Sequence, residues 1–211
     1  MDMPTVQTED VHSRAAAEAL LAAASEGDEA EVAALLKRGV PVDVTDGQGN
    51  TPLLLATAQN RVEIARLLVA AGADVNRQNR IHDSAYLLAG ASGRLKILQL
   101  TLIHGADLRS TNRYGGTALI PSCERGHVDV VATLLKAGVD PDHVNKLGWT
   151  GLLEAILLSD GGPRHQAIVK QLIEAGANLN LADNDGVTPL QHARQRNQTT
   201  IARMLEVAGA H

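Results

Sequence analysis

The stretch RYGGTALIPSCERGH, residues 113–127, carries side chains that could do chemistry. Cys123 could act as a nucleophile, and His127, four residues later, could act as its base. Glu124 and Arg125 add a carboxylate and a guanidinium between them. A nucleophile of this kind also needs a third group that orients the base, and the sequence places none beside His127. The elements that hold the stretch therefore decide its interpretation.

Those elements repeat along the chain. A glycine followed by Ala or Val recurs at intervals of 33, 33, 33, 38 and 33 residues, at Gly39, Gly72, Gly105, Gly138, Gly176 and Gly209. A Thr or Ser lies 21 residues before most of these glycines, at Thr51, Ser84, Thr117 and Thr188, and Thr150 belongs to the same series. Two markers in register predict an array of 33-residue units with a five-residue insertion in the fifth.

Each unit has the pattern of two short helices. In the second unit, Thr51 is the predicted N-cap, Pro52 takes the first helical position, and Leu53 is the first core residue. Small residues follow, so that neighbouring helices can pack closely. A second helix then carries aliphatic residues at helical spacing from Ile64, and Gly72 ends it.

This frame gives the opening stretch a structural interpretation. Thr117 is the predicted N-cap, and Cys123 fills a small-residue position, so we expect its thiol to be buried in a helix–helix contact. Pro121 lies at the fourth helical position, where we expect a local distortion and not a broken helix. Most of the stretch is therefore predicted to be scaffold, with no catalytic residue. Arg113, Tyr114, Glu124 and Arg125 are left without a structural role.

The repeated pattern resembles the ankyrin repeat. Asp46, Gly49, Thr51, Pro52 and Leu53 match its opening, as do Asp183, Gly186, Thr188, Pro189 and Leu190. Gly126-His127 and Gly72-Ala73-Asp74 match its later parts. The resemblance implies an all-α fold, an α-solenoid of helix-turn-helix units joined by β-hairpin-like loops. The chain departs from the pattern where the His of T-P-L-H is replaced by Leu54, Leu87, Ile120, Leu153 and Gln191.

The predicted organisation is an N-terminal tail over residues 1–12 and a repeat domain over 13–211. Its units cover about 13–45, 46–78, 79–111, 112–144, 145–182 and 183–211, with the insertion near 159–163. Polar residues in the first and last units are typical of terminal caps, so we expect the array to start and stop within this chain.

The resemblance also implies a binding surface, because loop tips and the ends of the first helices line the concave face of ankyrin arrays. On this chain the partner-binding positions are Arg80, Ile81, Arg113, Tyr114, Glu124, Arg125, Lys146, Leu147, Trp149, Leu157 and Leu158. They include a basic row (Arg80, Arg113 and Lys146) and an apolar strip (Ile81, Tyr114, Leu147 and Trp149). Stacked units would space the row by roughly 10 Å, close to the Debye length of about 8 Å.

Two interpretations of this surface remain open. Loop tips can simply be solvated, and a row of three cations can arise by accident. Alternatively, the basic row and apolar strip bind a partner protein with an acidic segment, since Arg and aromatic residues dominate binding hot spots.

The insertion also has two interpretations. Its polar residues Asp160, Arg164 and His165 belong either to a tolerated surface loop or to a functional loop. Gly and Pro there favour a loop over a helix extension, projecting beside Leu157-Leu158 and closing one end of the groove.

Composition limits the other function classes. A net charge of −5 and a pI of about 5.9 disfavour nucleic-acid binding, and the single Cys fits a reducing compartment. Histidines are scattered over different units, so we expect no metal and no cofactor. No apolar run is long enough to span a membrane. We therefore expect a cytoplasmic, monomeric, non-enzymatic interaction module of bacterial type. The alternative is a small-ligand or catalytic pocket near Tyr114, Trp149, Glu154 and the 159–165 loop.

Overall fold

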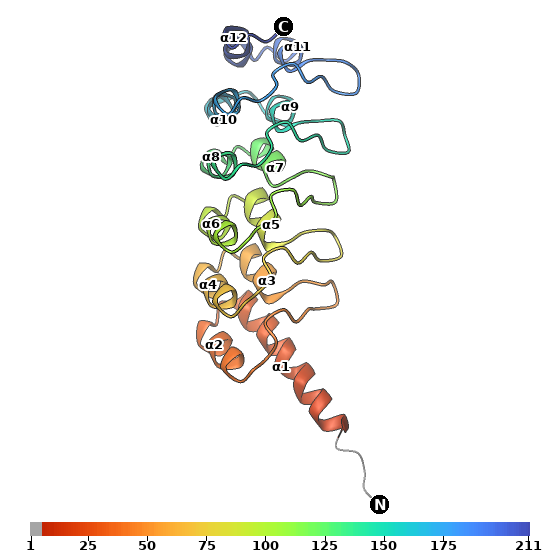
Figure 1. Ribbon diagram of the computed structural model, residues 1–211, viewed down its shortest axis with the longest axis vertical. Coiled ribbons are helices and arrows are strands. Elements are labelled where there is room, and N and C mark those ends of the chain that lie inside the picture. The colour runs from red at the N-terminus through yellow and green to blue at the C-terminus, as the bar shows by residue number, and fades with distance from the viewer. Residues whose placement is uncertain (1–5) are drawn as a thin grey trace, which may run out of the picture.

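The computed structural model describes residues 6–211, with side chains from residue 13 onward, and stacks six helix pairs into an elongated array (Figure 1). Odd-numbered helices lie beside the long loops, and even-numbered helices lie on the far side (Figure 1). Residues 6–211 contain no β-strand, which confirms the all-α solenoid. The helices are α1 (Val6–Glu26), α2 (Glu29–Lys37), α3 (Pro52–Ala58), α4 (Val62–Ala70), α5 (Ala85–Ala91), α6 (Leu95–Ile103), α7 (Leu119–Glu124), α8 (Val128–Ala137), α9 (Gly151–Leu157), α10 (Pro163–Glu174), α11 (Pro189–Gln195) and α12 (Thr199–Val207).

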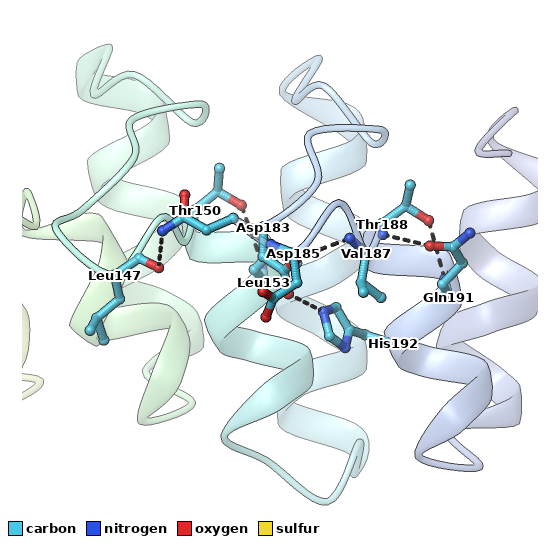
Figure 2. A network of polar contacts seen from close by, with 10 residues as sticks. Leu147, Thr150, Leu153, Asp183, Asp185, Val187, Thr188, Gln191 and His192 are labelled. Atoms are coloured by element: carbon cyan, nitrogen blue, oxygen red, sulfur yellow. Dashed lines mark hydrogen bonds and ion pairs between the residues drawn. The ribbon is translucent and has the colours of Figure 1, made fainter.

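Four of the five predicted hydroxyl caps are confirmed. Thr51 Oγ1 accepts a hydrogen bond from the backbone N–H of Leu54 at 3.1 Å, so it satisfies one free amide of α3. Ser84, Thr150 and Thr188 cap α5, α9 and α11 in the same way. Figure 2 shows the Thr188 cap, in which the Gln191 side chain also accepts from the Thr188 N–H.

The prediction of Thr117 as the cap of α7 was wrong. Helix α7 begins only at Leu119, and the buried Oγ1 of Thr117 has no hydrogen-bond partner. Pro121 explains the difference, because it has no N–H to donate to the carbonyl of Thr117. That carbonyl accepts instead from Ile120 N at 3.3 Å, which tightens the first turn. The expected distortion is therefore local, and the helix remains intact through Glu124.

Small residues between neighbouring inner helices set the stacking distance. A Cβ on Gly90 would come 2.9 Å from the Cβ of Ala118, and one on Gly151 would come 3.0 Å from the Sγ of Cys123. Nearly all of the core between these layers is aliphatic, and Tyr86 is the one fully buried aromatic among the described residues. Close packing of thin layers therefore replaces a large central core.

The five long loops share one hydrogen-bonding design. In each, an Asp or Asn side chain accepts from backbone N–H groups two and four residues later, as Asn145 Oδ1 does from Leu147 N at 3.0 Å and Trp149 N at 3.1 Å. The same residue type occupies the equivalent position at Asp46, Asn79, Asn112 and Asp183. Neighbouring loops are also linked by hydrogen bonds. Lys146 N donates to Tyr114 O at 3.0 Å, and Asn184 Nδ2 donates to Leu147 O at 3.2 Å.

Two boundaries differ from the sequence prediction. Helix α1 begins at Val6, so it extends into the residues 1–12 that were assigned to a tail. The insertion was predicted as a projecting loop near 159–163, but α10 begins at Pro163 and runs for 12 residues. Pro at the first helical position, after Gly162 in an extended conformation, favours this early start. Part of the insertion therefore lengthens a helix.

Candidate functional site

A groove of about 390 Å³ lies on the inner side of the third, fourth and fifth units. Residues of α5, α7, α9 and the intervening loops line it, among them Leu88, Tyr114, Pro121, Glu124, Leu147 and Glu154. Both apolar and charged side chains line this surface, so the groove can take both an apolar and a polar group.

Six of the eleven predicted partner-binding residues line this groove: Arg113, Tyr114, Glu124, Arg125, Leu147 and Leu158. Tyr114 and Leu147 are 56% and 54% exposed, so each presents apolar area that no described residue covers. Arg113 lies over the Tyr114 ring with its Cζ 4.9 Å from the ring centroid, which favours an ordered guanidinium at the rim.

The other five predicted residues lie outside the lining: Arg80, Ile81, Lys146, Trp149 and Leu157. Arg80 and Lys146 are exposed, whereas Trp149 and Leu157 are half-buried. The Nζ of Lys146 donates to the carbonyl of Arg113 at 2.8 Å, so this cation also holds two loops together. The structure thus places the predicted basic row on three successive loops but brings only Arg113 to the groove.

The groove contains three carboxylates. Glu154 on α9 is only 6% exposed, and its Oε1 accepts from Asn145 Nδ2 at 2.7 Å. Burial raises the pKa of Glu154 to about 7, with Glu124 adding to the rise and Arg125 opposing it. Burial also raises the pKa of Asp83, while Arg113 and Arg125 lower it. Asp83 was not predicted as a site residue, and Glu154 was named only for the alternative pocket.

The surroundings of Cys123 and His127 indicate packing roles. Cys123 is fully buried between α7 and α9, and desolvation strongly raises the pKa of its thiol, which makes it a poor nucleophile. His127 lies against Gly93, and burial lowers its pKa. The predicted packing role of Cys123 is confirmed.

The insertion does not close the end of the groove. His165, predicted as a loop residue, lies in α10, is 9% exposed, and its Nε2 hydrogen-bonds the carbonyl of Glu124 at 2.8 Å. Gln198 Nε2 binds the carbonyl of Ser159 at 3.1 Å, which ties the loop to the last unit. Of residues 158–165, Leu158 alone lines the groove, so the alternative pocket involving Trp149 and residues 159–165 does not form as predicted.

Metal binding and membrane insertion can be judged for the described part of the chain. In that part, no group of three or more His, Cys, Asp or Glu residues is arranged to hold a metal ion. None of its helices combines the length and the apolar character needed to cross a membrane.

Comparisons with known proteins agree on one repeat type. The family described as ankyrin repeats (3 copies) matches residues 6–79, 86–183 and 138–210. Ankyrin repeat protein YahD of Escherichia coli (strain K12) is 40% identical over 191 residues, covering 90% of this chain and 95% of that protein. An ankyrin repeat domain from Acinetobacter baumannii AYE has a TM-score of 0.89 and 55% identity, covering 91% and 98% of the two chains. The ankyrin repeat domain of Bcl-3, a member of the IkappaB family, has a TM-score of 0.82 and 29% identity, covering 92% of this chain and 86% of that one.

Proposed function

The chain belongs to the ankyrin-repeat family, and we propose that it is a non-catalytic module that binds a partner protein in the groove of its inner face. Ankyrin repeat domains generally mediate protein–protein interaction, and here the groove of about 390 Å³ is the observation that carries the proposal. The groove extends over three units. Tyr114 and Leu147 are exposed in it, and Arg113 and Arg125 are among the residues that line it.

The proposed partner is a peptide segment with acidic residues, bound across units 2–5. Tyr114 supplies apolar contact area in the groove, and Arg113 supplies a planar donor for a carboxylate. Arg80 and Lys146, on the neighbouring loops, would attract the same segment without entering the groove. Ile81, Trp149 and Leu157 would extend the contact at its margins.

We further propose that the protein works as a monomer in the bacterial cytoplasm. Its relatives in Escherichia coli and Acinetobacter baumannii support a bacterial origin. A single, buried thiol is compatible with a reducing compartment.

A binding assay on the partner recovered from a native lysate tests the proposal. We expect Arg113→Glu to slow association several-fold and to flatten its salt dependence, because rim charges act mainly on encounter. Tyr114→Ala should instead speed dissociation, with a loss of about 2 kcal/mol if the ring is a hot spot. Arg66→Glu on α4, an exposed reversal on the outer face, is the control and should bind like wild type.

Melting curves of each variant separate lost binding from lost folding. If Arg113→Glu and Tyr114→Ala both bind the partner like wild type, the groove of units 3–5 is not the binding site. A variant with Trp149→Ala then tests the margin of the surface.

A further inference from the structure

Glu154 differs in chemical type from the residues at the equivalent positions of the three units before it. The equivalent inner-helix positions of the second, third and fourth units hold Leu55, Leu88 and Pro121, spaced by 33 residues. Leu88, Pro121 and Glu154 all line the groove. The fold therefore accepts an apolar residue at this position, and the carboxylate of Glu154 is not required for stacking.

One oxygen of Glu154 has no partner. Its Oε1 accepts from Asn145, but Oε2 accepts no hydrogen bond from the described residues and is not sealed from solvent. Among those residues Glu154 also forms no ion pair. Burying a carboxylate without a paired cation is costly. A cation supplied from outside the chain would offset that cost for the ionised form of Glu154.

The surrounding charges favour a cation as that partner. Glu124, on the adjacent helix α7, lies close enough to disfavour the ionised form of Glu154. Arg125 opposes this effect, but its Nη1 is bound to the carbonyl of Ala91 at 2.7 Å and makes no ion pair with Glu154. With Asp83, the groove holds three carboxylates against the guanidiniums of Arg113 and Arg125.

We propose that the partner segment inserts a lysine or arginine side chain into the groove, where Glu154 and Glu124 accept its N–H groups. This rests on the proposed function and specifies it, because the segment then carries a basic residue between Glu124 and Glu154 and an acidic residue toward Arg113. The cation reaches the free Oε2 of Glu154, while Asn145 holds Oε1 in place. Apolar contacts with Pro121 and Leu158 cover the methylene groups of its stem.

Selection from a random twelve-residue peptide library at pH 8 tests this pairing. Each recovered peptide is measured against wild type, Tyr114→Ala, Glu154→Gln and Glu174→Gln. Gln keeps the oxygen that Asn145 binds, so the first glutamate variant removes charge and little else. Glu174, in an exposed pair with Lys170 on α10, is a control that removes one charge outside the groove.

We expect peptides whose binding requires Tyr114 to contain Lys or Arg and to lose at least about tenfold in affinity with Glu154→Gln. Replacing the peptide's basic residue with Gln should remove that sensitivity, and Glu174→Gln should have no effect. Tyr114-dependent peptides without a basic residue, or unaffected by Glu154→Gln, would overturn this inference and leave the proposed function standing. A library that yields no Tyr114-dependent peptide would count against both.

Discussion

At the scale of single residues, the groove depends on side chains that differ from their repeat equivalents. Glu154 stands where the second and third units have Leu55 and Leu88, and Tyr114 stands where they have Gln48 and Ile81. Both changes work against simple stability, since one buries a carboxylate and the other exposes an aromatic ring. Such departures are expected where a repeat protein has a binding site.

The raised pKa of Glu154 predicts that the stability of the fold depends on pH. This pKa is about 7 in the folded protein and near 4.5 when unfolded, so between these pH values the folded state holds a proton that the unfolded state has released. The stabilising contribution of Glu154 is therefore present below about pH 4.5 and is lost as the pH rises through 7. Relative to Glu154→Gln, we expect the wild type to lose on the order of 2 kcal/mol of unfolding free energy between pH 5 and 8.

Chemical denaturation of both proteins at several pH values measures this difference. The groups that face Glu154 are Glu124, Arg125 and Cys123 on α7 and Asn145 in the adjoining loop, and they are the same in both proteins. Asp83 and His127 also have shifted pKa values, but their contributions cancel in the comparison. A constant difference across this range would show that Glu154 titrates normally.

At the scale of elements, the caps explain which parts of the fold were predictable. Thr51, Ser84, Thr150 and Thr188 could be assigned from position alone, because a cap is a local interaction over three residues. Thr117 could not, because Pro121 removes an N–H one turn later and changes the start of α7. The start of α10 could not be predicted from local sequence either. Gly162 and Pro163 are compatible with a loop or a helix start, and the contact of His165 with Glu124, 41 residues away, accompanies the helix.

The candidate site could be predicted only in part from repeat spacing. Repeat spacing predicted the loop-tip and helix-end residues, and six of them line the groove. Spacing gave no measure of side-chain direction, so Lys146 and Trp149 were grouped with Tyr114 although they lie outside the lining. The buried carboxylate of Glu154 could have been found by aligning the units, since the residue is charged where three others are apolar.

Two alanine variants test the caps with a built-in control. Thr51 and Thr117 are both 2% exposed, but Thr51 Oγ1 accepts from Leu54 N and Thr117 Oγ1 has no partner. We expect Thr51→Ala to destabilise the protein by about 1 kcal/mol, because it leaves a helix amide unsatisfied. Thr117→Ala should be nearly neutral, since it removes a buried hydroxyl that makes no hydrogen bond. Denaturant midpoints of the two variants measure the contrast, and equal losses would contradict the cap assignment.

At the scale of the whole molecule, each helix pair packs against the pairs directly before and after it along the stack (Figure 1). Side-chain hydrogen bonds between units recur at equivalent positions of the repeat. Arg61, His165 and Gln198 lie at or near the starts of their outer helices. Each binds a carbonyl at or near the end of the inner helix of the preceding unit. Because these hydrogen bonds and the aliphatic contacts are local, stability should be close to a sum over units and interfaces. The groove, confined to units 3–5, then depends little on the outermost layers.

Removing the last unit tests this additivity. Deleting residues 183–211 takes away α11 and α12, with the buried side chains of Leu190, Ile201 and Leu205, and frees the carbonyls that Gln198 binds. It also exposes an apolar face of α9 and α10, so we expect a lower denaturant midpoint and a helical signal reduced by roughly one unit's share. The remaining five units should stay folded and keep the groove, because every residue that lines it precedes position 183. Circular dichroism during denaturant titration follows both quantities. Complete loss of helicity without denaturant would mean that the array folds as one indivisible unit, and that the groove depends on the last pair of helices.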